Sequence, residues 1–495
     1  MKILFLQPPL GAWATWGVTR SINIGYAQLA GYLRQHNPDV KVEALDCRGW
    51  ELNETQMLER VGQAQPDIVY VGDILHTTGG LAVVFIYNEA ARKVKERYPH
   101  IKTVVGGIFY ASATEFTLNE NPSIDFCIAG ECEETLSDLV KQLSSSKPEL
   151  FSVKGLGHRA GGKVVLNAYR SLIEDLDSLP MPAYDLFPMD KYVCHTYWKN
   201  YSETWNSRGC PAACTFCYEW GQFDPRGNQD LKHYRYRSGK KVVEEMELLY
   251  NKFGTRVITM MDDTYNVSRQ RMEETIEESL KRDLKMKWMP LGRAPYFIRD
   301  IDLFKDLRRA GCFMCLVGLE VADDDELRKI KKGITVEQVK EAVAKLREAG
   351  IATVLTWMVG FEDDDEQKIK MRFAAVDEID PDIIALQFLT PIPGSPIWND
   401  VTAKGLLKME DLNKKIRQWD FHQPIIPTNH LSISAIADLG SWAFREFYSK
   451  PGRLQRVMHN RGYDPLVGSC VRDFMQNVGH FQKESHGTKS YVGKE

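Results

Sequence analysis

Short apolar runs alternate with amphipathic stretches through residues 1–140. The apolar runs are KILFLQ, VKVEALDC, PDIVYVGDIL, IKTVVGG and DFCIAG. The remaining stretches repeat apolar residues with helical spacing, near 25–35, 54–65, 81–98 and 133–143. Five strands separated by helices predict an α/β domain with a parallel, doubly wound sheet of flavodoxin-like type. Such a sheet binds its ligand at the carboxyl ends of its strands.

Loops rich in glycine or proline follow the predicted strands of this sheet. Backbone without bulky side chains lets a large, flat ligand approach closely, although glycine is also common in turns that bind nothing. The loop residues that would face such a ligand are Pro9, Leu10, Gly72, Asp73, Gly106, Gly107, Gly130 and Glu131.

A second alternation of strands and helices fills residues 201–397. Its apolar runs include VITMMDD, KWMPLG, CFMCLVGLE, IATVLTWMVG and DIIALQFLTPIPG. Six strand-helix repeats predict a partial (β/α)6 barrel, about two repeats short of a closed barrel. The chemistry of such barrels takes place at the carboxyl ends of the strands.

Two further segments complete the predicted organisation. Residues 149–200 contain the hairpin-like HRAGGKVVLNAYR and the proline-punctuated LPMPAY, which is typical of an interdomain linker. Residues 398–495 are predicted to be mostly helical, with a disordered polar tail after Glu484. The expected domains are therefore 1–148, 149–200, 201–397 and 398–495.

Composition argues against several classes of protein. A net charge of −4 over 495 residues indicates no basic surface for nucleic acid. The longest apolar runs, such as Ile351–Gly360, are far shorter than the roughly 20 residues of a membrane span. The MKILFL start runs into Pro8-Pro9 without a signal-peptide cleavage site. We therefore expect a strand there and a cytoplasmic protein.

Three of the ten cysteines fall within eight residues, at Cys210, Cys214 and Cys217. Ten cysteines are too few for a disulfide scaffold in a chain of this length, so the cluster of three favours metal binding. Zinc would normally need a fourth protein ligand, and His195 and His233 lack a paired spacing. A 4Fe-4S cluster accepts three cysteines when an external ligand completes the fourth iron. The scattered cysteines Cys47, Cys127, Cys132, Cys194 and Cys470 are expected to be small buried side chains.

The segment RGCPAACTFCY, which ends at Tyr218, carries CxxxCxxC followed by an aromatic residue and then strand-helix repeats. This motif resembles the radical S-adenosylmethionine (SAM) superfamily. The resemblance implies that the amino and carboxylate groups of SAM chelate the open iron. One electron then cleaves a carbon–sulfur bond of SAM to give a 5′-deoxyadenosyl radical. The resemblance also implies that Tyr218 contacts the adenine region.

Further residues match the same superfamily in chain order, at the ends of the second, fourth and fifth predicted barrel strands. The resemblance implies that they surround SAM. An acidic residue after a strand is also a common helix cap, and one of them could cap a helix that starts near Asp324. The matched residues are Asp262, Asp263, Gly318, Glu320 and Gly360.

Residues 1–400 together resemble the cobalamin-binding subgroup of this superfamily. The segments GGIFYASATEF, AGECEETLSDLV, DSLPMPAYDLFP and TPIPGSP are similar to its recurring segments. The resemblance implies cobalamin at the loops of the first sheet. Corrinoid domains with a histidine below the cobalt carry DxHxxG after the first strand, whereas Asp73–Gly79 (DILHTTG) has another spacing and follows the third. We therefore expect no histidine ligand and a lower face covered by Leu75 or His76, although His76 can equally be a loop residue bonded to backbone.

Cys312 and Cys315 form a second CxxC pair, within a predicted strand. Positions i and i+3 of a strand point to opposite faces. We therefore expect that the two sulfurs do not share a metal ion.

The resemblance implies an enzyme that methylates an unactivated carbon of a small-molecule substrate through methylcobalamin, with a second SAM restoring the methyl group. It also implies an external one-electron reductant such as flavodoxin or ferredoxin. A radical cyclisation without methyl transfer, as in the anaerobic porphyrin ring cyclases, stays open as the alternative. A non-catalytic corrinoid or redox sensor would need an output module, and the predicted helical tail contains none.

Overall fold

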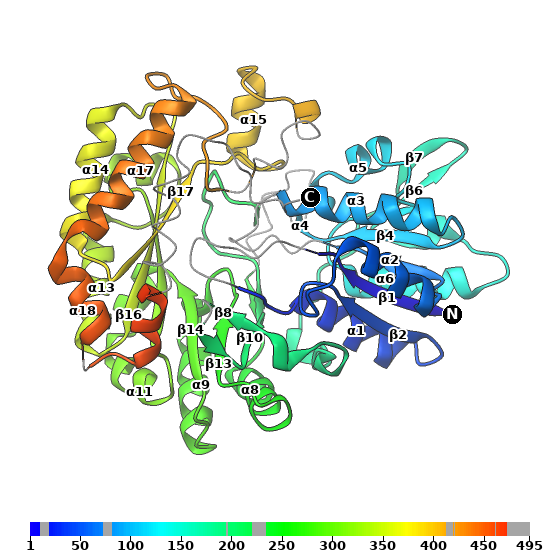
Figure 1. The fold of residues 1–495 in the computed structure, drawn as a ribbon, viewed down its shortest axis with the longest axis horizontal. Coiled ribbons are helices and arrows are strands. Elements are labelled where there is room, and N and C mark those ends of the chain that lie inside the picture. Colours follow the sequence, from blue (N-terminus) through cyan, green and yellow to red (C-terminus); the bar gives the residue numbers. More distant parts are fainter. Residues whose placement is uncertain are drawn as a thin grey trace.

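Two α/β units lie side by side in the computed structural model of the chain (Figure 1). The structure describes residues 1–9, 19–72, 82–194, 197–219, 234–411, 419, 421–460 and 462–472. The amino-terminal unit is blue to cyan in Figure 1, and the second unit runs from green to orange.

The amino-terminal unit is built on a seven-stranded sheet with the order β2-β1-β3-β4-β5-β6-β7. The first five strands are parallel, which confirms the predicted flavodoxin-like sheet. Strand β1, which lies between β2 and β3, is buried at Ile3, Leu4, Phe5 and Leu6, as expected for a strand covered by helices on both faces. The strands are β1 (Lys2–Gln7), β2 (Lys41–Asp46), β3 (Ile68–Tyr70), β4 (Lys102–Gly106), β5 (Phe126–Ile128), β6 (Leu156–Ala160) and β7 (Lys163–Leu166).

Helices connect the parallel strands of this sheet. Helix α2 begins with a reciprocal capping box between Asn53 and Gln56, which explains why the helix starts there. The helices are α1 (Ile24–His36), α2 (Glu54–Ala64), α3 (Ala82–Arg97), α4 (Ile108–Ser112), α5 (Thr114–Glu120) and α6 (Cys132–Ser144).

The segment between the two units has two parts. The hairpin β6–β7 is antiparallel to β5 and so extends the first sheet. The following residues form short turns that pack between the units, where the Tyr184 hydroxyl donates to Glu245 at 2.5 Å. The short elements are η1 (Leu150–Ser152), η2 (Leu176–Ser178), η3 (Tyr184–Leu186), η4 (Met189–Lys191), β8 (Val193–Cys194) and β9 (Trp198–Lys199).

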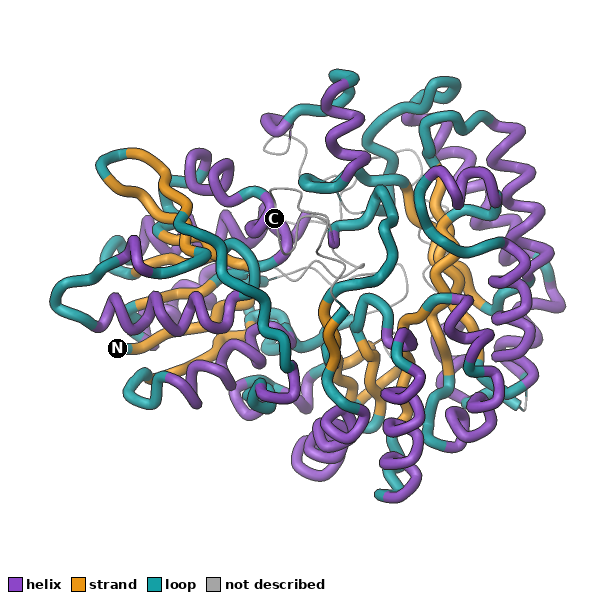
Figure 2. Tube along the Cα trace, turned by 180° about the vertical axis from the view of Figure 1, so that it is seen from behind, coloured by secondary structure: helices purple, strands orange, loops and turns teal. Residues whose placement is uncertain are grey.

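The second unit is an open barrel of six parallel strands in the order β10-β13-β14-β15-β16-β17, which confirms the predicted partial barrel. Its helices lie outside the strands (Figure 2). The first strand precedes the cysteine motif, and the pair β11–β12 is a separate antiparallel ribbon. The strands are β10 (Tyr201–Thr204), β11 (Ser207–Arg208), β12 (Arg235–Tyr236), β13 (Val257–Met260), β14 (Lys287–Gly292), β15 (Met314–Glu320), β16 (Ala352–Val359) and β17 (Ile383–Phe388).

The barrel helices follow the predicted alternation. Helix α13 starts at a capping box between Thr335 and Gln338, and α14 starts where the Asp365 side chain accepts from the Lys368 amide. The helical segments are α8 (Gly239–Phe253), η6 (Tyr265–Val267), α9 (Arg269–Lys281), α10 (Ala294–Arg299), η7 (Ile301–Leu303), α11 (Phe304–Arg309), α12 (Asp324–Lys329), α13 (Val336–Glu348) and α14 (Glu366–Ile379).

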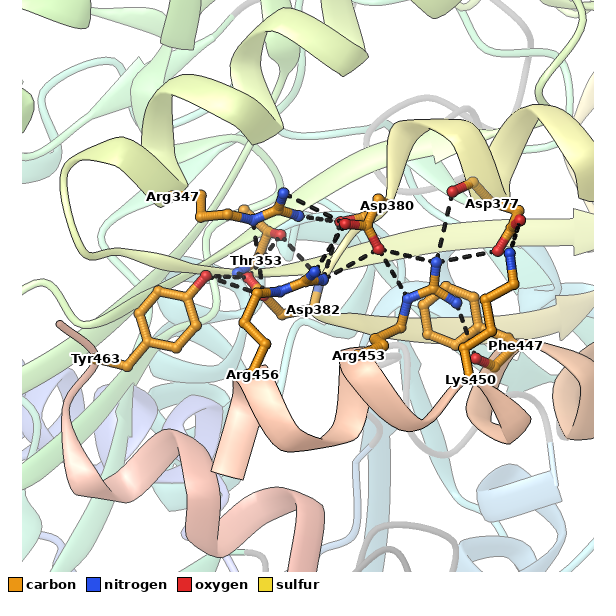
Figure 3. A network of polar contacts seen from close by, with 10 residues as sticks. All are labelled: Arg347, Thr353, Asp377, Asp380, Asp382, Phe447, Lys450, Arg453, Arg456 and Tyr463. Carbon is orange, nitrogen blue, oxygen red and sulfur yellow. Dashed lines mark hydrogen bonds and ion pairs between the residues drawn. The ribbon is translucent and has the colours of Figure 1, made fainter. Parts of the chain in front are cut away.

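The carboxy-terminal region is mostly helical, as predicted, with α15 (Pro396–Ala403), α17 (Ile433–Ser449) and α18 (Pro451–His459). A network of ion pairs attaches α18 to the barrel (Figure 3). Arg453 and Arg456 of α18 both contact Asp380, and Asp382 also accepts from the Tyr463 hydroxyl at 2.9 Å. The Asp382 side chain is fully buried, and Arg456, which lies 3.3 Å from it, and Tyr463 provide it with donors in the interior. The tail after Glu484 lies outside the described residues.

The segment after β17 connects the two units. Trp398 and Trp419 pack in one buried cluster with Ile108 and Phe109 of the amino-terminal unit. This contact joins the carboxy-terminal region to the amino-terminal unit. None of the described helices is both long enough and apolar enough to span a bilayer.

Candidate functional site

The three cysteines of the motif line one cavity, which we call the barrel cavity. Residues at the carboxyl ends of all the barrel strands from β13 to β17 line the same cavity. This is the position at which barrels of parallel strands bring together functional side chains. The lining includes Cys210, Cys214, Cys217, Asp263, Leu291, Gly318, Glu320, Thr356 and Gln387.

Backbone contacts hold the cysteine loop against the barrel. The Thr215 amide donates to the Ile330 carbonyl at 3.0 Å, and the Ile397 amide donates to the Thr215 carbonyl at 3.0 Å. Gly209, directly before the first cysteine, has φ = 80°, a conformation that favours glycine. The Cys210 sulfur lies 3.3 Å from the Thr264 hydroxyl. The loop is therefore fixed on both sides.

The sulfur ligands fit an iron–sulfur cluster better than a single ion. Within the described ranges, no three Cys, His, Asp or Glu side chains converge on a point where one ion could be held. Burial raises the pKa of Cys214 and Cys217, while Lys332 and Arg293 act in the opposite direction on Cys214. Metal binding deprotonates such thiols. Three thiolates around a wide cavity leave room for a cubane whose fourth iron takes an external ligand.

Four of the residues matched to SAM line the barrel cavity: Tyr218, Asp263, Gly318 and Glu320. The Tyr218 hydroxyl donates to the Asp263 carboxylate. Burial, together with the neighbouring Asp262 carboxylate, raises the pKa of Asp263 to about 6. Asp263 Oδ2 is a buried oxygen with no donor in the described part of the chain. A ligand with an ammonium or hydroxyl group would satisfy it.

Glu219 is a second acid of this site, and the sequence comparison did not identify it. It lines the barrel cavity directly after Tyr218. Burial, and then the Asp263 carboxylate, raises the pKa of Glu219 well above its usual range. Its Oε1 also lacks a donor among the described residues. The pair of acids therefore offers unsatisfied acceptors to a bound ligand.

Glu320 faces the cavity and does not cap a helix. Its carboxylate accepts from Lys332 Nζ at 2.7 Å and from the Thr356 hydroxyl at 3.0 Å. The N-terminus of α12 is capped instead by Asp323, which accepts from the amides of Asp325 and Glu326. The interpretation of Glu320 as the cap of this helix was wrong.

Asp262 and Gly360 lie away from the lining of the barrel cavity. The Asp262 side chain is fully buried and pairs with Arg271 at 2.9 Å. Adjacent residues at a strand end point in opposite directions, so only one of the two neighbouring aspartates can face the cavity. Gly360 has φ = 99° and donates its amide to the Asp364 carboxylate at 2.9 Å, which is a turn-forming role.

A second cavity opens at the carboxyl edge of the first sheet, and we call it the sheet-edge cavity. Four predicted loop residues line it: Gly72, Gly107, Gly130 and Glu131. A Cβ on Gly130 would meet no atom within 4 Å and would project into open space. A Cβ on Gly72 would lie 2.7 Å from the Gly106 carbonyl oxygen. Glycine thus keeps this floor flat enough for a large planar ligand.

The other predicted corrinoid residues have different positions. Gly106 lies beneath Gly72 rather than among the lining residues, and Pro9 is also absent from the lining. Leu10, Asp73, Leu75 and His76 fall outside the described residues. The expectation that cobalt has no histidine ligand therefore stays a prediction.

Trp205 and Arg208 of the second unit also line the sheet-edge cavity. Arg208 pairs with Glu131 at 2.9 Å. Glu131 therefore belongs to a buried ion-pair cluster as well as to the cavity wall. Sequence analysis missed Arg208 because its partner lies 77 positions earlier in the chain, although the residue does stand inside the cysteine motif.

The expectation for Cys312 and Cys315 was wrong in its geometry. Strand β15 begins only at Met314, so Cys312 precedes the regular strand. The two sulfurs lie 3.6 Å apart, and both residues are fully buried. Neither residue lines the barrel cavity.

Comparison with known proteins agrees with this geometry. Residues 19–140 match the B12 binding domain, and residues 207–373 match the radical SAM superfamily. An uncharacterized methyltransferase of Pyrococcus horikoshii is 29% identical over 96% of this chain and 98% of its own length. The anaerobic magnesium-protoporphyrin IX monomethyl ester cyclase of Rubrivivax gelatinosus is 27% identical over 96% of this chain and 83% of its own length.

Solved structures share the fold over nearly the whole chain. The radical SAM methyltransferase TsrM of Kitasatospora setae has a TM-score of 0.70 at 16% identity, covering 97% of this chain and 99% of that one. The cobalamin-dependent radical SAM enzyme OxsB also has a TM-score of 0.70, covering 98% of this chain and 71% of its own. The chain is therefore an enzyme in which a B12-binding domain precedes a radical SAM domain.

Proposed function

We propose that this enzyme is a cobalamin-dependent methyltransferase that acts on an unactivated carbon of a small-molecule substrate. In this proposal Cys210, Cys214 and Cys217 hold a 4Fe-4S cluster and cobalamin binds in the sheet-edge cavity. When bound, these cofactors supply the chemistry, since reductive cleavage of SAM yields a radical that removes substrate hydrogen and methylcobalamin donates the methyl group. Tyr218, Asp263, Gly318, Glu320 and Glu219 would surround SAM.

One observation carries the proposal: a single short segment lines both cavities. Trp205 and Arg208 line the sheet-edge cavity, and Cys210 and the residues after it line the barrel cavity. The two cofactor sites therefore lie on neighbouring sides of the same chain segment. A substrate held between them would need little movement between hydrogen removal and methylation, and such proximity accounts for a large part of enzymatic rate enhancement.

The chain's own residues line the barrel cavity with apolar and positively charged groups. Leu389, Ile392 and Phe421 add apolar surface to its lining, from the segment that packs on the amino-terminal unit. Lys332 and Arg293 also line it and place positive charge beside Cys214. These two cations favour the anionic thiolate of Cys214 and so oppose the effect of its burial.

The test is anaerobic reconstitution of the full chain followed by turnover with methyl-labelled SAM, a chemical reductant and cell extract. We expect about four irons per chain, bound cobalamin and 5′-deoxyadenosine. The label should appear in a product of the extract, which identifies the substrate. Absence of both deoxyadenosine and bound cobalamin would contradict the proposal. An external flavodoxin or ferredoxin is expected to replace the chemical reductant.

Radical cyclisation is the second candidate. The relative from Rubrivivax gelatinosus is named a cyclase and matches 96% of this chain, the same share as the Pyrococcus methyltransferase. The labelled-SAM experiment separates the two functions. Cyclisation predicts deoxyadenosine and a converted substrate that carries no label, whereas methylation predicts a labelled product and S-adenosylhomocysteine from a second SAM.

A further inference from the structure

Four charged side chains are buried where the sheet-edge cavity meets the cysteine loop. Glu131 follows β5, Glu133 lies in the first turn of α6, Arg208 belongs to β11 and Arg235 to β12. Their side chains are between 3% and 13% exposed. We call these four residues the interdomain charge cluster. Charges this far from water persist only when they are paired and hydrogen-bonded.

Arg208 holds two carboxylates of the amino-terminal unit at once. Its Nη1 lies 2.9 Å from Glu131 Oε1, and its Nη2 pairs with Glu133. Only a planar guanidinium presents donors in a fixed fork that can bind two acids in this way, and lysine cannot replace it.

Arg235 and the linker complete the cluster. Arg235 Nη1 lies 2.9 Å from Glu131 Oε1 and donates to the Ile173 carbonyl at 2.6 Å. The Ile173 amide in turn donates to Glu131 Oε2 at 2.7 Å. Glu131 is therefore the point at which the first sheet, the linker and the barrel unit meet.

The position of Arg208 connects this cluster to the iron site. It stands two residues before Cys210, with only Gly209 between them. It also pairs in register with Arg235 across the β11–β12 ribbon. A displacement of Arg208 from Glu131 would therefore move the first cysteine of the motif as well.

We infer that Arg208 is a positioning residue that fixes the corrinoid of the sheet-edge cavity relative to the cluster of the barrel cavity. This inference rests on the proposed function. Arg208 acts through Glu131 and Glu133, which belong to the loop and helix at the carboxyl edge of the first sheet. An error of about 1 Å between reacting groups can lower a rate by roughly 100-fold. The gain in rate from a rigid connection between the two sites would therefore offset the unfavourable free energy of burying these charges.

The experiment compares full-length holoenzymes of the wild type, Arg208→Lys and Arg208→Gln. The matched control is Arg282→Gln, because Arg282 also pairs with two acids, Glu247 and Glu278, but lines neither cavity. The measurements are iron and cobalamin content, the Kd of cobalamin, and the magnetic dipolar coupling between Co(II) and the reduced cluster by pulsed EPR. The amounts of methylated product and of 5′-deoxyadenosine are measured separately.

We expect one narrow distribution of cobalt–cluster distances in the wild type and the control. In Arg208→Lys the iron content should be unchanged, and the distance distribution should broaden or shift. Methyl transfer should fall by roughly 100-fold, whereas deoxyadenosine formation should fall by less than about threefold, because only the first depends on the placement of both cofactors.

Unchanged coupling in both Arg208 variants would overturn the inference. Weaker cobalamin binding with unchanged coupling would also overturn it, because Arg208 would then be a direct contact of the corrinoid. If Arg208→Gln does not fold, Glu133→Gln removes one of the two contacts and should broaden the distribution to a smaller extent. A wild-type chain that binds no cobalamin contradicts the proposed function itself, a result distinct from either of these.

Discussion

The two cavities of this enzyme differ in the chemical groups that line them. Glycine backbone lies at three strand ends of the sheet-edge cavity, at Gly72, Gly107 and Gly130, beside a few charged side chains. Functional side chains dominate the barrel cavity, which contains three cysteines, three acids and two cations. We therefore expect the first cavity to select its ligand largely by shape, and the second by charge and coordination. A larger side chain should weaken ligand binding in the sheet-edge cavity, and a changed charge should weaken ligand binding in the barrel cavity.

The largest effect is expected from loss of a cluster ligand. Cys214→Ala should abolish deoxyadenosine formation and remove most of the bound iron, because two thiolates cannot hold the cubane. Cobalamin binding should persist, since Cys214 lines only the barrel cavity. The measurements are iron content, deoxyadenosine by chromatography and bound cobalamin by absorption. Cys470→Ala, a buried cysteine outside both cavities, is the control. Reductive cleavage of SAM by Cys214→Ala would refute the cluster assignment.

The next effect tests shape in the other cavity. A Cβ on Gly72 would lie 2.5 Å from the Tyr70 ring and 2.7 Å from the Gly106 carbonyl oxygen. Gly72→Val should therefore distort the floor and weaken cobalamin binding by roughly 100-fold, or about 2.8 kcal/mol. Deoxyadenosine formation should stay within about threefold of the wild type. The control is Gly452→Ala, where a Cβ meets nothing within 4 Å. If Gly72→Val binds cobalamin with wild-type affinity, the shape of the cavity floor is not the basis of binding.

The fold and the cysteine triad could be predicted because their signals are local. Alternating apolar runs define the strands, and three cysteines within eight residues define the cluster loop. The glycines of the sheet edge were also visible, since they stand at the strand ends that a doubly wound sheet brings together.

Features that depend on side-chain direction or on distant partners could not be predicted. Asp262 and Asp263 are neighbours, and only the packing decides that the first pairs with Arg271 while the second faces the cavity. The partners of Glu131 lie 77 and 104 positions further along the chain. The proximity of Cys312 and Cys315 depends on a strand that starts two residues later than the apolar run.

Charge in the barrel cavity is tested by Glu320→Gln. The carboxylate is available for charge-assisted hydrogen bonds to SAM, so we expect a loss of affinity of roughly tenfold, about 1.4 kcal/mol. Iron content should be unchanged. The melting temperature should also fall, because Lys332 would remain buried without its carboxylate.

Asp323→Asn is the matched control for this variant, since Asp323 is the side chain that caps α12. It should lower the melting temperature and leave SAM affinity unchanged. If Glu320→Gln behaves in the same way as the control, Glu320 does not belong to the SAM site.

The last effect is on stability rather than on affinity, and it concerns the unfavourable free energy of keeping an acid in the barrel cavity. Burial raises the pKa of Asp263 from 3.8 to about 6. Between these two pH values the folded chain binds a proton that the unfolded chain has released, so stability falls as pH rises through this window. At pH 7 the cofactor-free protein should therefore be less stable than an otherwise identical chain with an uncharged residue, by roughly 1–3 kcal/mol.

Asp263→Asn should thus raise the melting temperature of the cofactor-free protein by a few degrees at pH 7 and leave it nearly unchanged at pH 4, while SAM affinity falls. Asp262→Asn should instead lower the melting temperature at pH 7, because it leaves the fully buried Arg271 without its carboxylate. Calorimetry of both variants at the two pH values gives the comparison. If both variants lower the melting temperature at pH 7, Asp263 stabilises the fold in the same way as Asp262. Its position in the cavity would then not be evidence that it binds SAM.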